Sequence, residues 1–317
     1  MGKACRSVVV MATFNGARFV LEQLESIRTQ SVPPDAVYIA DDGSTDGTVE
    51  LVQEWIARHH LEGRWRIRVN PENLGYAENF MRLIAEAVRE GADYIFLADQ
   101  DDIWLPGKAE RMLSLMSRFP AMGLLCSDLE PFYTDPGALP YGLAGLKWGK
   151  KPFLRFSAQW IWALRPGCSY LLAAGFAGEA VQYWEQWGMN GVGIVHDTFL
   201  WALAHLKDVI AYDPHVTMRY RRHGSNGSGM VTMLEKEQRV HLLEQTILWM
   251  ELFLKEFGTM PSGFPERQVR FFKRRLSYLS RGRSALPALF ADGLLHLDCY
   301  IRKRHFLSDL YVCPRRR

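Results

Sequence analysis

The first 115 residues of the chain alternate apolar, strand-like runs with amphipathic helical segments, and this order constrains the fold more than any other feature. In the helical segments apolar residues recur at three- and four-residue spacing, as in "ARFVLEQLESIRTQ" and "GYAENFMRLIAEAVRE". Strands that alternate with helices usually pair in parallel. The pattern therefore predicts an α/β fold, a mostly parallel sheet with helices on both faces. The predicted strands are "SVVVMATFN", "AVYIADDGSTDGT", "RWRIRVN" and "ADYIFLAD".

The order of elements changes after residue 120. The run "AMGLLCSDLEPFY" predicts a further strand, and the Gly/Pro-rich stretch "TDPGALPYGLAG" predicts a loop. Residues 160–230 mix short strands, helices and polar turns, and from Met233 onward the periodicity is helical. We therefore expect an α/β domain over residues 1–230 and a helical, basic region over residues 231–317.

Composition limits the class of protein. The net charge is only +3 over 317 residues, which disfavours a nucleic-acid-binding protein. The five cysteines lack CxxC spacing, which favours free thiols in a reducing compartment over disulfides or a zinc site. The N-terminus has no secretory-signal pattern, and no window approaches the ~20 apolar residues that cross a bilayer. We expect a cytoplasmic protein that can touch a membrane without spanning it.

Three polar clusters follow predicted strands at their carboxyl ends: "TFN", "ADDGSTD" and "ADQDD". Because ligands bind outside these ends in an open parallel sheet, we expect the three clusters to converge on one site. A fourth cluster, "NPENLGYAEN", follows the third strand and contains Asn73, Gly75 and Asn79. Gly75 permits close approach of the backbone to a ligand, although an ordinary helix N-terminus explains it equally well.

The acidic cluster contains Asp99, Asp101 and Asp102 within four positions. A divalent cation such as Mg²⁺ or Mn²⁺ would relieve their repulsion, since it takes few protein carboxylates and leaves positions for phosphate oxygens. A solvated acidic turn is the alternative. The position behind an apolar strand, with "IWLPGK" opening a helix, favours the cation site.

A second pair of carboxylates, Asp41 and Asp42, follows the second predicted strand. A carboxylate there can accept the imide N–H of uracil or thymine, a donor that adenine and cytosine lack at that position. An Asx turn that caps the next helix is the alternative interpretation.

Four ordered stretches carry a family resemblance: "VVVMATFNGARFVLEQLESIRTQS", "YIADDGSTDGT", "NLGYAENF" and "FLADQDDIWLPGK". Together they resemble the inverting glycosyltransferases of family 2, which have the GT-A fold. The looser matches "PGCSYLL", "HDTFLWALA" and "YRRHGSN" resemble the bacterial rhamnosyltransferase-like branch of that family. The resemblance implies a nucleotide-sugar-binding half over residues 1–115 and an acceptor and catalytic-base half over residues 116–230.

The resemblance also implies roles for individual residues. Asp42 would bind the base of the nucleotide. Together with the polar residues after the third predicted strand, the candidate nucleotide-binding residues are Ala12, Thr13, Asn15, Asp41, Asp42, Asn73, Gly75, Asn79 and Asp99. The metal set comprises Asp101 as principal ligand, Asp99, Asp102 and His223. The segment "YRRHGSN" would fold over the diphosphate, with His223 as a phosphate or metal contact and Arg219, Arg221 or Arg222 as counter-charge.

Asp197 in "HDTFLW" matches the family's general base. Such a carboxylate takes the acceptor's proton as its oxygen attacks, and a single displacement inverts the anomeric carbon without a covalent nucleophile. Asp197 could instead be only a helix N-cap, and His223 a surface-loop histidine. Trp160 and Trp162 are candidates to stack on an acceptor sugar, and burial in a strand is the alternative for both.

The expected function is metal-dependent inverting transfer of a sugar from a dTDP- or UDP-sugar to a saccharide or lipid-linked acceptor, in the synthesis of a cell-surface polysaccharide such as O-antigen or capsule. Rhamnose is favoured through the resemblance alone. A phosphohydrolase with Asp99 as nucleophile is an alternative, but such enzymes place this motif near the start of the domain. A non-catalytic nucleotide-sugar-binding protein is another.

The last fifty or so residues interleave Arg and Lys with aromatic and aliphatic residues. Basic amphipathic helices can hold a protein at the inner face of the cytoplasmic membrane, where lipid-linked acceptors lie. An ordinary helical packing domain with a solvated, charged face is the alternative interpretation.

Overall fold

The computed structural model describes residues 5–136, 138, 154, 158–189, 193–224, 236–258, 263–300 and 303–313. The chain divides into two compact units. One comprises Met1–Arg155, Ala163–Gln186 and Val195–Ser228, and the other comprises Phe156–Trp162, Trp187–Ile194 and Gly229–Arg317. The second unit thus takes in two short segments that precede residue 230, and the functional halves expected at 1–115 and 116–230 stay a prediction. Most of the predicted Gly/Pro-rich loop lies outside the described residues.

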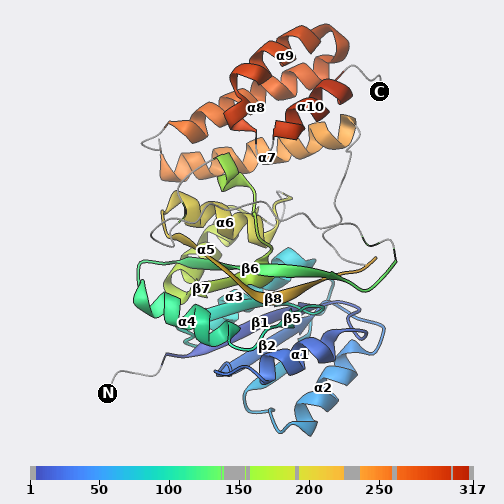
Figure 1. The fold of residues 1–317 in the computed structure, drawn as a ribbon, viewed down its shortest axis with the longest axis vertical. Helices are drawn as coiled ribbons and strands as arrows, with labels where there is room; N and C mark the ends of the chain where they lie inside the picture. The colour runs from blue at the N-terminus through green and yellow to red at the C-terminus, as the bar shows by residue number, and fades with distance from the viewer. Residues whose placement is uncertain are drawn as a thin grey trace. The chain divides into compact units, whose positions relative to one another are not determined.

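The first unit is built on a sheet whose described strands lie in the order β3-β2-β1-β4-β7-β6-β8-β5 (Figure 1). Strands β1 to β4 pair in parallel, as do β6 and β8, whereas β7 is antiparallel to β4 and β6 and β5 is antiparallel to β8. This mixed sheet confirms the predicted α/β class. The strands are β1 (Ser7–Thr13), β2 (Ala36–Asp41), β3 (Trp65–Val69), β4 (Tyr94–Asp99), β5 (Ile103–Trp104), β6 (Leu124–Tyr133), β7 (Tyr170–Ala173) and β8 (Ile210–Arg222).

Helices cover the two faces of this sheet. Alternate residues of β1 point to opposite faces, and Val9 and Met11 share a buried cluster with residues of α1, α2 and α4. Helix α3 packs on β1 and contacts α5 and α6. The helices of this unit are α1 (Val20–Arg28), α2 (Thr48–Arg58), α3 (Tyr76–Arg89), α4 (Lys108–Arg118), the short η2 (Gly167–Ser169), α5 (Ala174–Gln186) and α6 (His196–Leu206).

The second unit is helical in its described residues, as the periodicity after Met233 predicts. Helix α8 lies between α7 and α9 (Figure 1). Within the described residues, no helix has both the length and the apolar character needed to cross a membrane. The elements are η1 (Ala158–Ile161), α7 (Lys236–Phe257), α8 (Phe264–Arg281), η4 (Gly282–Ala285), α9 (Leu286–Leu295), η5 (Leu297–Cys299) and α10 (Lys303–Val312).

A buried carboxylate ties three parts of the second unit together. Asp309 on α10 is 0% exposed and accepts hydrogen bonds from Arg239 of α7, Arg275 of α8 and the Tyr300 hydroxyl. Burial opposes ionisation of Asp309, but the two arginines outweigh it and lower its pKa. A buried ion pair of this kind is costly to break, because the partner left behind stays desolvated.

Candidate active site

Side chains at the carboxyl ends of β1, β2 and β4 bond to one another. The Gln100 side chain accepts from the Phe14 N–H at 2.9 Å and donates to the Phe14 carbonyl at 3.0 Å. The Asn15 N–H donates to Ser44 Oγ at 2.7 Å, and Asn15 Oδ1 accepts from the Thr45 N–H at 2.9 Å. The three polar clusters therefore meet at one edge of the sheet, as expected from the strand order.

Gln100 was not singled out in the sequence, because it stands between more conspicuous carboxylates. The one available signal is Gly16, since a Cβ there would overlap with Gln100 Oε1. A Cβ at position 16 would therefore force the Gln100 side chain to move from its place beside the first turn.

Asp41 is a structural residue of its own turn. It is 0% exposed, and its two oxygens accept four hydrogen bonds, from the Thr13 and Ser44 hydroxyls and from the N–H groups of Gly43 and Ser44. A carboxylate offers about four acceptor positions. The Asp41 carboxylate is thus used within its own turn and by the Thr13 hydroxyl in this conformation, and the placement of Thr13 and Asp41 at the nucleotide stays a prediction.

Asp42 fixes the loop that precedes α3. Its carboxylate accepts from Asn70 Nδ2 at 3.0 Å and from the N–H groups of Leu74 and Gly75, each at 2.8 Å. Asn73 Nδ2 donates to the Asp42 carbonyl at 2.9 Å. One acceptor position of the carboxylate is left for a base N–H, so base binding by Asp42 stays a prediction, as do the roles of Asn73 and Gly75.

Asn79 is fully buried in α3, where its Nδ2 donates to the Ala40 carbonyl at 2.8 Å. This hydrogen bond supports the end of β2, whereas Asn79 Oδ1 is buried without a hydrogen-bond partner among the described residues. The nucleotide-binding role of Asn79 stays a prediction. Ala12 is partly exposed and Asn15 is exposed, with φ of 47° at Asn15. These two positions stay open to a ligand.

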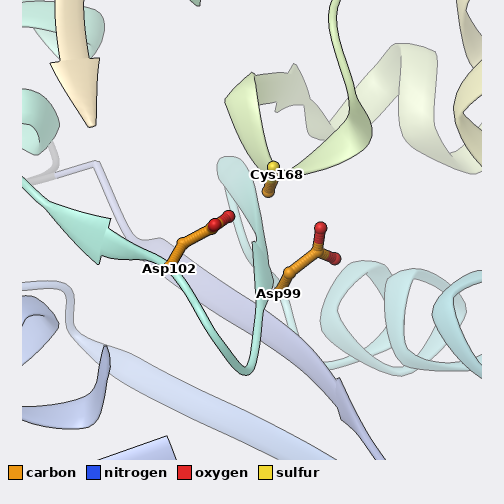
Figure 2. A group of neighbouring side chains, drawn as sticks. All are labelled: Asp99, Asp102 and Cys168. Atoms are coloured by element: carbon orange, nitrogen blue, oxygen red, sulfur yellow. The ribbon is translucent and has the colours of Figure 1, made fainter. Parts of the chain in front are cut away.

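Two carboxylates of the acidic turn and one thiol form a tight group (Figure 2). One ligand atom each from Asp99, Asp102 and Cys168 lies within 4.8 Å of the others, and both carboxyl groups reach toward Cys168. Asp102 is 0% exposed, and its Oδ1 accepts the Arg221 N–H at 3.0 Å. Its Oδ2 is buried and accepts no hydrogen bond of ordinary geometry from the described residues. The Cys168 thiol, a weak donor, lies beside this carboxylate.

The acidic turn holds more negative charge than its surroundings neutralise. Burial, then the charge of Asp101, raises the pKa of Asp99 to about 7, and the same two causes raise the pKa of Asp102 well above its usual range. Lys108 is the buried cation behind the turn; its Nζ donates to the Cys168 carbonyl at 3.0 Å, and burial lowers its pKa to about 8. Raised carboxyl pKa values of this origin are relieved by a bound cation.

Asp101 has a histidine partner. His223, at the end of β8, places Nε2 2.8 Å from Asp101 Oδ2, and both side chains are largely buried. Carboxylate oxygen and imidazole nitrogen are donors that Mn²⁺ accepts, and Mg²⁺ takes the carboxylate. The Asp101 carboxylate, the His223 imidazole and the Asp102 oxygen that lacks a hydrogen-bond donor thus fit a divalent cation.

Two predicted counter-charges are used elsewhere. Arg221 is buried: its Nε donates to the Asp101 carbonyl at 2.6 Å, and its guanidinium pairs with Glu22. It therefore holds the acidic turn in place. Arg222 is 2% exposed. Both residues are buried in this conformation, and a role of either as counter-charge to the diphosphate stays a prediction. Arg219 lies over the Phe132 ring at 4.3 Å, and the "YRRHGSN" segment beyond residue 224 lies outside the described residues.

The predicted base, Asp197, begins α6 beside the acidic turn. Its Oδ1 accepts the Thr198 N–H at 2.6 Å, and burial raises its pKa to about 6. The charge of Asp197 also raises the pKa of Asp99, after burial and the charge of Asp101. A carboxylate with a pKa near 6 is ionised at neutral pH and is a stronger base than an exposed aspartate.

Residues 167 and 168 connect these two groups. The Gly167 N–H donates to Asp197, and a Cβ on Gly167 would lie 2.8 Å from His196 Nε2 and 3.3 Å from Asp197 Cβ. The next residue, Cys168, lies against Asp99 and Asp102. One peptide therefore spans the distance between the base and the acidic turn, and only glycine fits at its first position.

Tyr76 is a site residue that the sequence analysis did not single out. It opens α3 and is 54% exposed, and its ring stands edge-on to His196 with 6.0 Å between centroids. Partial burial, then the negative charges of Asp197 and Asp99, raise its pKa. An exposed aromatic ring thus lies beside both carboxylates. Its signal in the sequence is the position directly after Gly75.

Trp160 does not belong to this site. It lies in the second unit at 0% exposure, donates its indole N–H to Gln268 Oε1 at 2.8 Å and packs against Trp249 and Phe253. The prediction that Trp160 stacks on an acceptor sugar is wrong, because its ring is inaccessible. Trp162 is 44% exposed in the same unit, and its acceptor role stays a prediction.

Comparison with known proteins agrees with this architecture. Residues 8–135 match the family described as Glycosyl transferase family 2. The chain is 29% identical over 240 residues to the dTDP-rhamnosyl transferase RfbG of Shigella flexneri, a match that covers 74% of this chain and 78% of that protein.

Two solved structures share the fold at low identity. S. aureus TarS 1-349 in complex with UDP-GlcNAc is 13% identical with a TM-score of 0.58, over 96% of this chain and 89% of that one. Mannosyltransferase PcManGT from Pyrobaculum calidifontis, in complex with GDP-Man and Mn²⁺, is 17% identical with a TM-score of 0.55, over 98% and 86%. Sequence and structure comparisons agree: residues 8–135 form a glycosyltransferase family 2 domain, and the fold is that of the GT-A glycosyltransferases.

Proposed function

We propose that this protein transfers a sugar, with inversion, from a dTDP- or UDP-sugar to a saccharide or lipid-linked acceptor in a metal-dependent reaction. One observation carries the proposal: a carboxylate with a raised pKa, Asp197, lies beside an acidic turn that is short of positive charge. Inverting transfer needs these two features together, a base for the acceptor and a site for the leaving diphosphate.

Asp197 acts as the general base. Its carboxylate takes the proton of the acceptor hydroxyl while the acceptor oxygen forms a bond to the anomeric carbon. The bond from that carbon to the diphosphate oxygen breaks in the same displacement, and its electron pair leaves with the nucleotide. Attack from the face opposite the leaving group inverts the configuration, as in base-assisted inverting glycosidases.

Asp101 and His223 would hold Mg²⁺ or Mn²⁺, with Asp99 and Asp102 behind them. When bound, the cation neutralises charge on the departing diphosphate. The protein's own contribution is to fix the turn: Arg221 bonds to the Asp101 carbonyl and to Asp102, and Gln100 ties the turn to the end of β1. Fixed donors need no rearrangement during the reaction.

The donor assignment rests on two supports. The named activity of the Shigella flexneri relative favours dTDP-rhamnose. The Tyr76 ring beside Asp197 and Asp99 offers an apolar surface against which a deoxysugar can pack. Asp42 keeps one acceptor position for the imide N–H that thymine and uracil share.

We place the reaction in the cytoplasm, in the synthesis of a cell-surface polysaccharide such as O-antigen or capsule. A lipid-linked acceptor would bring the enzyme to the inner face of the cytoplasmic membrane, in peripheral contact.

Thermal-shift measurements against a panel of nucleotides and nucleotide sugars, with and without Mn²⁺, test the proposal. We expect dTDP- and UDP-compounds to raise Tm only when Mn²⁺ is present, and Asp101→Asn to abolish that dependence. Asp208→Asn, an exposed carboxylate after α6, is the matched control. Stabilisation by purine nucleotides alone, or by pyrimidine nucleotides regardless of metal, would contradict the proposed donor and cation.

A further inference from the structure

The positive charge of the chain is concentrated at one end of its sequence. Residues 264–317 contain thirteen Lys and Arg against four Asp and Glu. The preceding 263 residues contain 25 Lys and Arg against 31 Asp and Glu. The small net charge of +3 is therefore the sum of an acidic catalytic part and a strongly basic C-terminal part. This separation of charge points to an anionic partner for the C-terminal part.

Helix α9 exposes an apolar stripe in this basic region. Phe290, Leu294 and Leu295 are 51%, 53% and 78% exposed, and Pro287 and Ala291 are exposed as well. These positions recur at three- and four-residue intervals, so they lie along one face of the helix. Large apolar side chains are rarely left in water in such a contiguous set without a partner.

The opposite face of α9 is firmly held. Leu289 and Gly293 are buried, and a Cβ on Gly293 would lie 2.5 Å from the Phe306 ring of α10. Asp292 accepts two hydrogen bonds from Arg274 of α8, at 2.8 and 3.0 Å. These contacts fix the rotation of α9 about its own axis, so the apolar stripe is a permanent surface of the second unit.

Cations flank the stripe. Arg281 ends α8, Arg283 lies in η4 before α9, and Arg304 lies on α10. All three are exposed, and none forms an ion pair within the part of the chain that the structure describes. The nearby acids are occupied, since Asp292 pairs with Arg274 and Asp298 pairs with Arg267. The surface around α9 therefore combines exposed apolar groups with uncompensated positive charge.

We propose that α9 lies in the interfacial layer of an anionic lipid membrane, with its Pro287–Leu295 stripe among the acyl chains and the flanking arginines at the headgroups. Apolar insertion together with lipid-headgroup attraction is the usual basis of such binding. A nucleic acid would leave the stripe in water, and a second copy would bring the same free arginines face to face. Membrane binding by α9 fits the lipid-linked acceptor of the proposed function. The evidence for it comes from α9 and the neighbouring arginines alone.

Vesicle co-sedimentation of the full chain tests this surface without any activity measurement, so that it and the proposed function can fail separately. We expect the wild type to bind phosphatidylcholine vesicles that contain about 30% phosphatidylglycerol, and to bind pure phosphatidylcholine vesicles several-fold less. The triple substitution Phe290→Gln, Leu294→Gln, Leu295→Gln should lower partitioning into both by about tenfold or more. Arg281→Gln with Arg283→Gln should lower binding to the anionic vesicles and remove its salt dependence.

A matched control is available on another helix of the same unit. Leu242 and Leu248 of α7 are 44% and 47% exposed, and Leu242→Gln with Leu248→Gln should leave vesicle binding unchanged. If the triple variant melts several degrees lower than the wild type, Leu295→Gln alone replaces it, since Leu295 is the most exposed of the three.

Any of four results would overturn the inference. Failure of the wild type to bind anionic vesicles is the first, and equal binding by the α9 variants is the second. The third is a wild-type dimer in light scattering that becomes monomeric in the triple variant and does not bind vesicles, which would assign the stripe to a second copy. DNA binding shared by the wild type and the triple variant, without vesicle binding, would give the basic surface to nucleic acid instead.

Discussion

His223 Nε2 lies 2.8 Å from Asp101 Oδ2, a contact between residues 122 positions apart that brings the end of β8 onto the acidic turn. Strand β8 reaches this point because its residue Arg219 pairs with Ile103 of β5, directly after the turn. The proposed cation site thus depends on β8, which lies next to the edge strand β5, as much as on the acidic motif itself.

The substitution His223→Ala should raise the Mn²⁺ concentration needed for half-maximal activity by about 10- to 100-fold, because it removes a nitrogen donor and the partner that orients Asp101. Activity titrated with Mn²⁺ measures this. His215→Ala, in the exposed middle stretch of the same strand, is the control and should leave the Mn²⁺ requirement unchanged. Equal metal requirements in both variants would exclude His223 from the cation site.

Asp197→Asn should lower kcat by about 10² to 10⁴-fold and leave nucleotide binding intact, because the amide keeps the shape but accepts no proton. Burial raises the Asp197 pKa to about 6, so kcat/KM of the wild type should rise with pH up to about 6 and level off above it. Activity against pH and calorimetric titration with the nucleotide measure the two effects. A variant that still turns over at the wild-type rate would remove Asp197 from the mechanism.

Gly167→Ala should reduce kcat at least tenfold, because the new Cβ would lie 2.8 Å from His196 Nε2 and would displace the start of α6 and its carboxylate. Gly175→Ala on α5 is the control, since a Cβ there meets nothing within 4 Å. Steady-state kinetics with melting curves distinguishes displacement of the base from general destabilisation. Comparable kinetics for the two variants would mean that the loop can shift freely.

Tyr76→Ala should raise the donor KM and lower kcat/KM by about tenfold, since it removes the apolar surface beside Asp197 and Asp99. Tyr76→Phe should retain most of the activity if the ring packs on the sugar. A loss in Tyr76→Phe as large as in Tyr76→Ala would assign the effect to the hydroxyl. The nucleotide without its sugar should bind all three proteins alike.

Asp102→Asn should stabilise the metal-free protein by an amount that grows with pH. Burial raises the folded-state pKa of Asp102, so the folded carboxyl keeps its proton at pH values where the unfolded one has lost it. The wild type therefore loses stability relative to the asparagine variant as pH rises above about 4, whereas below that pH the two should melt alike. Melting curves from about pH 4 to pH 8 measure the difference in stability between the two proteins. Added Mn²⁺ should make that difference smaller.

The N-terminal part of the sheet could be predicted from the sequence because β1, β2 and β4 are mainly apolar runs and β3 alternates apolar residues with arginines. All four strands lie where expected. The two-residue strand β5 is too short to leave a pattern, and the polar and basic residues in β8 interrupt its apolar run. Both strands depend on pairing with each other, which no local window contains.

The site could be located from the sequence, but the use of each polar group could not. Asp41, Asn79 and Arg221 have residue types that bind nucleotides, yet each makes hydrogen bonds within the protein. Asp41 bonds to its own turn, Asn79 bonds through Nδ2 to the end of β2, and Arg221 bonds to the acidic turn. Gln100 and Cys168 are ordinary in the sequence and matter through partners that the fold brings to them. Whether a polar atom is free for a ligand depends on the count of its hydrogen bonds.

The carboxylate of Asp309 restricts how the C-terminal end of the protein can be shortened. Removing α10 would delete the anion that Arg239 and Arg275 both contact, and would strand two desolvated guanidinium groups in the middle of the helical unit. A truncated protein that no longer reaches a bilayer could then have lost its architecture and not its lipid contact. Point changes on α9 avoid this ambiguity, since its solvent-facing stripe takes no part in that ionic junction.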